Sequence, residues 1–210
     1  DPPGAESRTC TYTHRSGKDI VRDTINIRLL PDIERAMPSI IRPWRHDDAP
    51  ALAALLNNEK ILADLRDGLP FPYTEEDARG YIGYVLSADA RELAAFAIEY
   101  EGRLAGSISL TRGVNIHRRT AELGYYVGEP FWGRGLATRA VGEICRYAFS
   151  GWDVLRVFAE PFAHNAASRR VLEKNGFLLE GVLRANAVKG GRVADMCMYS
   201  LLSPALGTRE

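Results

Sequence analysis

Hydrophobic and polar positions follow two different spacings along this chain, and each spacing predicts a different kind of element. Short apolar runs that alternate with polar residues, or that stop at Gly or Pro, are typical of strands. Glu101-Gly102 predicts a tight turn between two of these runs. Strands are therefore expected at 39–44, 93–100, 103–111, 120–127, 154–159 and 196–202.

Apolar residues that lie three or four positions apart predict helices. Asp47 or Asp48 is the expected cap of the first helix, which has Pro50 in its first turn. The second helix opens at Thr74 with the spacing of a capping box, and the last one ends at Asn175-Gly176. Helices are therefore expected at 47–56, 74–85, 137–149 and 166–174.

The helix expected at 137–149 carries a continuous apolar face. Residues on this face recur with helical spacing, so they would pack together against a sheet. Cys145 lies in the same helix and is expected to be a small core residue. The face consists of Ala140, Val141, Ile144, Tyr147 and Ala148.

The order of these elements is that of a mixed α/β fold, with antiparallel meanders and helices that cross back over the sheet. A chain of 210 residues favours one domain with extensions. The domain is expected at 39–204, followed by a tail at 205–210. Residues 1–38 read as a partly ordered N-terminal extension, in which 19–30 would form a short amphipathic helix or strand.

Composition excludes several classes of function. Lys plus Arg number 27 and so do Asp plus Glu, so no net field favours nucleic acid or an anionic membrane. No segment approaches the roughly 20 apolar residues that span a bilayer. The three cysteines are far apart, which favours neither a disulfide framework nor a metal site. The first residues lack the features of a secretory signal, and a cytoplasmic location is expected.

The richest local chemistry lies between the strand at 120–127 and the helix at 137–149. A strand that leads through a Gly-rich turn into a helix leaves several N–H groups pointing one way at the positive end of the helix dipole. Such a helix start binds anions, and Gly133 and Gly135 lack the side chains that would keep a diphosphate away. The turn matches neither a Rossmann fingerprint nor a Walker loop. Alone, it fits a phosphate site and a plain tight turn equally.

Three stretches in a fixed order decide between these alternatives. Together they resemble the GCN5-related N-acetyltransferase (GNAT) superfamily, and most closely its branch of ribosomal-protein N-terminal acetyltransferases (RimJ/RimL-like). The resemblance covers roughly 39–202 and implies a mixed, mostly antiparallel sheet with a splay between two parallel strands and helices on both faces. The stretches are Gly128 to Thr138, His164 to Ser168 and Arg170 to Phe177.

The resemblance implies an acetyl-CoA site. Main-chain groups of the loop would hold the diphosphate, and those of Tyr126 and Val127 would pair with the pantetheine arm, which Asn165 would also contact. Trp132 stands where most of the family has Gln or Arg, a departure that the ribosomal-type branch shares. Sheet packing, an N-terminal cap and solvated charge are the alternative roles of these residues. The loop residues are Gly133, Arg134, Gly135, Leu136, Ala137 and Thr138.

The resemblance also implies how acetyl transfer would work. Ser168 would protonate the departing thiolate, because Leu172 stands where many relatives carry a tyrosine acid. Glu122 and Glu160 are alternative general bases, each equally compatible with a solvated surface position. No metal is expected. A structural role is expected of Asp195, and Trp44, Phe71 and Tyr73 are expected to line an acceptor pocket or to anchor core and loop.

The expected function is acetyl-CoA-dependent N-acetylation of a primary amine by direct attack. The acceptor would be a protein N-terminal α-amine or a small-molecule amine, and an acidic stretch between Asp64 and Asp77 would attract a cation or simply be solvated. The alternative is an inactive coenzyme A-binding sensor or scaffold. A homodimer formed through residues 1–38 is left open.

Overall fold

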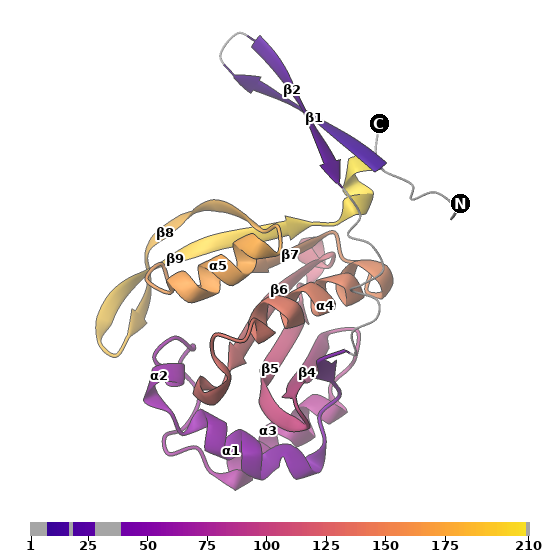
Figure 1. Ribbon diagram of the computed structural model, residues 1–210. Coiled ribbons are helices and arrows are strands. Elements are labelled where there is room, and N and C mark those ends of the chain that lie inside the picture. The colour runs from indigo at the N-terminus through magenta and orange to yellow at the C-terminus, as the bar shows by residue number, and fades with distance from the viewer. Residues whose placement is uncertain (1–7, 17–18, 28–38, 209–210) are drawn as a thin grey trace. The chain divides into compact units, whose positions relative to one another are not determined.

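The computed structural model describes residues 8–16, 19–27 and 39–208, and the chain divides into two compact units, 1–38 and 39–210 (Figure 1). The first unit contains a hairpin of β1 (Arg8–Ser16) and β2 (Asp19–Ile27), paired antiparallel. Of the helix or strand expected at 19–30, the described part is the strand β2, and residues 28–30 lie outside the described residues. Expectations for residues 1–7 and 209–210 also fall outside them.

The second unit is built on a seven-stranded sheet in the order β3-β4-β5-β6-β7-β9-β8. Neighbouring strands run antiparallel except for β6 and β7, which are parallel. This arrangement confirms the predicted mixed, mostly antiparallel sheet. The strands are β3 (Ile41–Arg42), β4 (Leu93–Tyr100), β5 (Arg103–Arg112), β6 (Thr120–Val127), β7 (Arg156–Ala159), β8 (Leu178–Lys189) and β9 (Arg192–Leu202).

The parallel pair separates soon after it forms. β6 and β7 are in register only at Thr120 opposite Arg156, Ala121 opposite Val157 and Glu122 opposite Phe158. Beyond that point β6 continues to Val127 with β5 as its partner on one side only. The sheet therefore has the expected splay, and one edge of β6 faces a gap.

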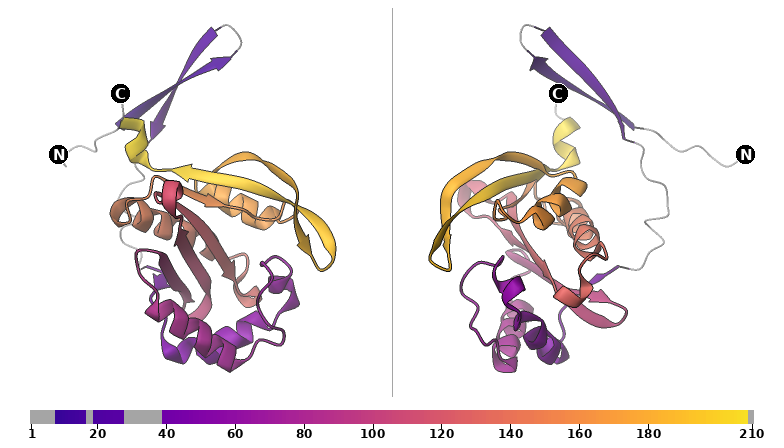
Figure 2. Two further views of the ribbon diagram at one scale, coloured as in Figure 1. Left: turned by 180° about the vertical axis from the view of Figure 1, so that it is seen from behind. Right: turned by 60° about the vertical axis from the view of Figure 1, so that its left-hand side comes forward.

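Helices cover both faces of this sheet (Figure 2). One face packs against α1 and α3 through a cluster that includes Leu52, Ile82 and Ala97. The other packs against α4 and α5 through a larger cluster that includes Ile98, Ile144 and Leu172. The helices are α1 (Ala49–Leu56), α2 (Glu59–Leu62), α3 (Glu75–Ser87), α4 (Leu136–Gly151) and α5 (Ala166–Lys174), and short 3-10 turns lie at His46–Asp48, Asn115–His117, Glu129–Phe131 and Pro204–Thr208.

The capping contacts agree with the sequence-based prediction at α3 and differ from it at α1. At α3 the Thr74 hydroxyl accepts from the Asp77 main-chain nitrogen and the Asp77 carboxylate accepts from that of Thr74, as predicted. At α1 the Asp48 side chain makes no cap bond. Its carboxylate instead accepts two hydrogen bonds from Arg42, at 2.7 and 2.8 Å. Asp48 therefore lies at the predicted cap position of α1, but its carboxylate binds the half-buried Arg42 guanidinium and the Arg45 main-chain nitrogen instead of the helix start.

Two further differences concern exposed apolar residues. The strand β8 was not predicted, and as the edge of the sheet it leaves Leu178, Leu179 and Val182 exposed, so no buried face marks it in the sequence. On α4, Ala140, Val141, Ile144 and Ala148 are buried as predicted, whereas Tyr147 is 39% exposed and meets Phe96 edge-on.

Candidate functional site

A cavity of about 890 Å³ follows the gap beside β6. It reaches from the loop before α4, past β6 and the start of α5, to the segment after α2. Every residue predicted for catalysis or for cofactor binding lines this cavity, although these residues come from four separate parts of the chain. Those residues are Glu122, Tyr126, Val127, Gly133, Arg134, Gly135, Leu136, Ala137, Thr138, Glu160, Asn165 and Ser168.

The loop at one end of the cavity has the backbone of an anion site. Gly133 and Gly135 have φ of 75° and 73°, in the left-handed region that favours glycine. A Cβ added at either residue would meet nothing within 4 Å, so the open side of the loop faces the cavity. The first turn of α4 follows, and its N–H groups have no acceptor within the helix. A diphosphate fits this end by charge and by shape.

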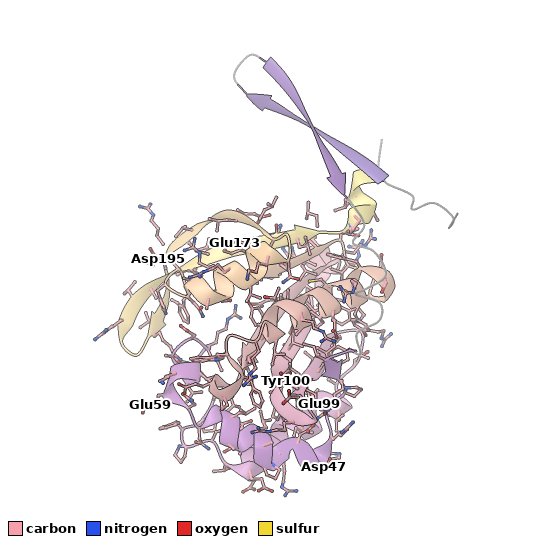
Figure 3. All side chains as sticks on the ribbon, viewed as in Figure 1. Asp47, Glu59, Glu99, Tyr100, Glu173 and Asp195 are labelled. Carbon is pink, nitrogen blue, oxygen red and sulfur yellow. The ribbon has the colours of Figure 1, made fainter. Side chains whose placement is uncertain are left out.

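Arg134 lies at the same end. Its guanidinium carbon is 5.4 Å from the ring centroid of Tyr100, which Figure 3 labels at the end of β4. This contact holds the charge of Arg134 beside the loop, and no carboxylate within the described ranges forms an ion pair with it. Arg139, in α4, donates a hydrogen bond to Glu143 at 3.2 Å. Glu143 in turn accepts hydrogen bonds from Ser39 and Ile40, so this pair joins α4 to the start of the domain.

Main-chain groups of β6 point alternately to β5 and to the gap. A Cβ on Gly106 of β5 would lie 2.2 Å from the Tyr126 main-chain oxygen, so that oxygen points to β5. The Val127 oxygen points the other way and accepts from Trp132 Nε1 at 2.7 Å. By the alternation of a strand, Tyr125 and Val127 present their N–H groups to the gap. Tyr126 turns its main chain away from the gap, contrary to the sequence-based expectation.

At the middle of the gap, α5 places two predicted residues. The Asn165 side chain accepts from the Ser168 main-chain nitrogen at 2.9 Å and so caps the helix. The Ser168 hydroxyl lies 2.8 Å from the hydroxyl of Tyr125 on β6. Burial raises the pKa of Tyr125 to about 12, although the hydrogen bond with Ser168 acts in the opposite direction. Sequence reasoning did not single out Tyr125.

Beyond Ser168 the cavity holds both candidate bases. Arg66, in the segment after α2, forms an ion pair with Glu122 and lies 3.5 Å from the Glu160 carboxylate. One guanidinium therefore brings together the two glutamates, which come from β6 and from the residue after β7. Sequence reasoning named both glutamates and missed Arg66, since nothing local in the sequence links residues 66 and 122.

The acidic stretch between Asp64 and Asp77 makes specific contacts. Asp64 lies 3.0 Å from His164 Nε2, and Asp67 accepts from Lys189 at 2.6 Å. Glu75 pairs with Arg79, and Asp77 completes the cap of α3. The stretch is thus divided between bridges to later elements and support of a helix start.

Other residues from the sequence analysis fall outside the cavity lining. Trp44 and Tyr73 are buried in the cluster beneath α1 and α3, whereas Phe71 is 58% exposed. The Asp195 carboxylate accepts from the Ala185 main-chain nitrogen at 2.7 Å, a structural contact in the β8–β9 hairpin. Cys145 is buried as predicted, and burial raises its pKa to about 12.

Two searches of the described part of the chain gave negative results. Over residues 8–16, 19–27 and 39–208, no group of His, Cys, Asp and Glu side chains could hold a metal ion. Within the same ranges, none of the helices has the length and apolar character needed to cross a membrane.

Comparison with known families agrees with this geometry. Residues 39–178 match the family described as the acetyltransferase (GNAT) domain. The chain therefore belongs to the GNAT acetyltransferase family, and the resemblance inferred from the three motifs is confirmed.

Individual relatives cover different shares of the chain. The uncharacterized N-acetyltransferase YoaA of Bacillus subtilis is 37% identical over 101 residues, or 48% of this chain and 56% of the relative. The match thus spans little more than half of that relative. The ribosomal-protein-serine acetyltransferase of Escherichia coli is 26% identical over 152 residues, or 72% of this chain and 84% of the relative.

Among solved structures, RimL, a ribosomal L7/L12 alpha-N-protein acetyltransferase in complex with coenzyme A, superposes with a TM-score of 0.68. The two sequences are 26% identical over 79% of this chain and 94% of that one. This superposition confirms the predicted fold class.

Proposed function

We propose that the protein is an acetyl-CoA-dependent N-acetyltransferase that transfers the acetyl group to a primary amine by direct attack. The observation that carries this proposal is the continuity of the cavity. A single space of about 890 Å³ joins an anion-binding loop, an unpaired strand edge, a serine hydroxyl and two carboxylates in that order. A long nucleotide-bearing thioester fits that order from its diphosphate to its acetyl group.

Acetyl-CoA would be held largely by main-chain groups. The N–H groups of Gly133 to Thr138 would receive the diphosphate, with Arg134 beside them. The pantetheine arm would lie along β6, where Tyr125 and Val127 present N–H groups to the gap. Because Trp132 already bonds the Val127 oxygen, Val127 would contribute its donor only. The side-chain amide of Asn165, whose oxygen caps α5, would contribute its nitrogen.

The acceptor amine must lose a proton before it can attack. For an amine with a pKa of about 10.4, deprotonation at neutral pH costs roughly 4–5 kcal/mol, and for an α-amine near 8 it costs about 1 kcal/mol. Glu122 or Glu160 would take that proton, directly or through water. Arg66 pairs with both glutamates, and an incoming ammonium group would take its place between them. Ser168 would protonate the departing sulfur.

Charge at the acceptor end of the cavity favours a cation. Asp64, Glu122 and Glu160 line this end, and Arg66 is the guanidinium among them. The excess of carboxylates suits a protonated amine, whether a protein N-terminus or a small-molecule amine, and disfavours an anionic acceptor.

Thiol release from acetyl-CoA tests the proposal. The protein should release thiol with at least one member of a panel of peptides with different first residues and of small amines. Calorimetry on the same sample should show binding of coenzyme A. Glu122→Gln and Glu160→Gln identify the base, since the correct variant lowers turnover about 100-fold or more and keeps cofactor affinity. Binding without release across the whole panel would contradict the enzyme and favour a coenzyme A-binding sensor.

A further inference from the structure

The Tyr125 hydroxyl meets α5 at two atoms of the same residue. It donates to the Ser168 main-chain oxygen at 3.2 Å and lies 2.8 Å from Ser168 Oγ, where either hydroxyl group can be the donor. Tyr125 comes from β6 and Ser168 from the third position of α5, which Asn165 fixes through its cap. Both side chains line the cavity, so this contact joins the two walls of the gap where the thioester would lie.

A hydroxyl group has one hydrogen, and its direction matters here. If Ser168 donates to Tyr125, the serine hydrogen points into the protein and away from any ligand. If Tyr125 donates to Ser168 Oγ, the serine hydrogen is free to point into the cavity. Only the second arrangement lets Ser168 act on a sulfur atom in the gap.

We infer that Tyr125 is a positioning residue for acetyl transfer: its hydroxyl donates to Ser168 Oγ and aims the serine hydroxyl at the departing sulfur. This inference rests on the proposed function. It also accounts for the position four residues beyond Ser168, where Leu172 is fully buried in the core and offers no hydroxyl. In this chain a tyrosine from β6 supports Ser168 as the acid, whereas the resemblance places a tyrosine acid of many relatives at the position of Leu172.

Acetyl transfer moves protons both at the amine nitrogen and at the sulfur. The ammonium group first loses one proton to the glutamate base, which passes it to water. The amine nitrogen then bonds to the thioester carbonyl carbon and loses its second proton to the same base, which again passes it to water. The carbon–sulfur bond breaks, and its electron pair stays on sulfur. Sulfur takes the Ser168 hydroxyl proton, Ser168 takes the Tyr125 proton, and water returns a proton to Tyr125.

The surroundings keep Tyr125 able to donate. Burial raises the pKa of Tyr125 to about 12, and the hydrogen bond with Ser168 lowers it by less. The charged residues that share the cavity with Tyr125 are Asp64, Arg66, Glu122, Arg134, Glu160 and Lys174. The phenol therefore stays protonated throughout the range in which an amine acceptor is partly deprotonated.

Steady-state kinetics on Tyr125→Phe, Ser168→Ala and the double variant test the inference. Tyr125→Phe should lower kcat about 10- to 100-fold, with the KM for acetyl-CoA changed less than about twofold. The double variant should be no slower than Ser168→Ala, because residues that act as a unit are not additive. Losses that multiply in the double variant would overturn the inference.

A second measurement separates donation from packing. Difluorotyrosine at position 125 keeps the shape of the ring and makes the phenol more acidic. Its kcat should fall on the basic side at a lower pH than that of the wild type, because a phenolate cannot donate to Ser168. An unchanged basic limb would show that Tyr125 only packs, and would overturn the inference even if Tyr125→Phe were poorly folded.

Tyr199→Phe is the matched control. Its hydroxyl also anchors α5, donating to Glu173 at 2.7 Å, but Tyr199 does not line the cavity. Removal of this hydroxyl should lower the melting temperature and leave kcat unchanged. Failure of the proposed function would look different, since the wild type itself would then release no thiol with any acceptor. If the wild type is active and Tyr125→Phe is equally fast, the inference is overturned and the proposed function is not.

Discussion

Trp132 donates a hydrogen bond of 2.7 Å from its indole nitrogen to the main-chain oxygen of Val127. This bond ties the start of the Gly-rich loop to the last residue of β6, so the loop is fixed relative to the edge of the gap. This chain has Trp132 at the position where Gln or Arg is more common in the family. The indole, 49% exposed, gives the position a role in holding the loop that the sequence alone did not suggest.

Trp132→Phe should weaken coenzyme A binding. The variant keeps an aromatic ring and loses one hydrogen bond, worth about 1 kcal/mol, or about a fivefold loss of affinity. Calorimetric titration with coenzyme A measures the loss. Trp152→Phe is the control, because Trp152 donates an equivalent bond of 2.7 Å to Ala90 outside the cavity. The control should lower the melting temperature and keep the affinity; an equal loss of affinity in both variants would contradict the role given to Trp132.

Gly135→Ala should lower coenzyme A affinity by about tenfold or more, a loss of about 1.4 kcal/mol. With φ of 73°, an alanine at this residue strains the backbone by about 1–2 kcal/mol, and its methyl group enters the diphosphate end of the cavity. Gly102→Ala is a matched control, since Gly102 has φ of 72° and equally open surroundings in the β4–β5 turn. Both variants should lose similar thermal stability, and only Gly135→Ala should lose affinity.

Arg66→Ala should improve the use of a cationic acceptor. Without the guanidinium, the ammonium group no longer competes for Glu122 and Glu160, and KM for the acceptor should fall about two- to fivefold, the scale of an exposed ion pair. Steady-state kinetics at low ionic strength measure the change. Arg91→Ala removes an exposed pair with Asp89 outside the cavity and should change nothing. A rise in KM would show that Arg66 binds the acceptor instead of yielding to it.

The Glu180→Gln variant should be less stable than the wild type near neutral pH, and the difference should shrink as the pH falls. Hydrogen bonds from Arg156 and then Ser200 lower the pKa of Glu180 from 4.5 to about 2. A depressed pKa stabilises the folded state above the unfolded value of 4.5, and this contribution is lost as the pH falls towards 2. Thermal melts between pH 7 and pH 3 measure it. In an Arg156→Gln background the effect of Glu180→Gln should be much smaller.

Much of the fold could be predicted because its signals are local. Glu101 and Gly102 both have positive φ, 50° and 72°, as the hairpin predicted between two alternating runs requires. The capping box at Thr74 and the Asn175-Gly176 stop, with Gly176 at φ 81°, are likewise read from a few adjacent residues. β8 could not be found this way, since an edge strand has no buried face to give it a period.

The site residues likewise divide into those with a local signal in the sequence and those without one. Residues 133–138, in the loop and the helix start, belong to a motif in the sequence, and all of them line the cavity. Tyr125 and Arg66 act through partners that lie 43 and 56 residues away, in Ser168 and Glu122. Contacts of that kind depend on how β6, α5 and the segment after α2 come together, and no spacing in the sequence records it.

Because the pairing of β6 with β7 is short, the two sides of β6 differ in their main-chain hydrogen bonding. By the alternation of main-chain groups along a strand, the amide of Tyr126 faces β5, whereas the amides of Tyr125 and Val127 face the gap, where pairing has ended at Glu122 and Phe158. In heavy water without coenzyme A, neighbouring amides of one strand should therefore take up deuterium alternately fast and slowly. Saturation with coenzyme A should slow exchange at the amides that face the gap. All amides of β6 should then exchange as slowly as those of a strand that is paired on both sides.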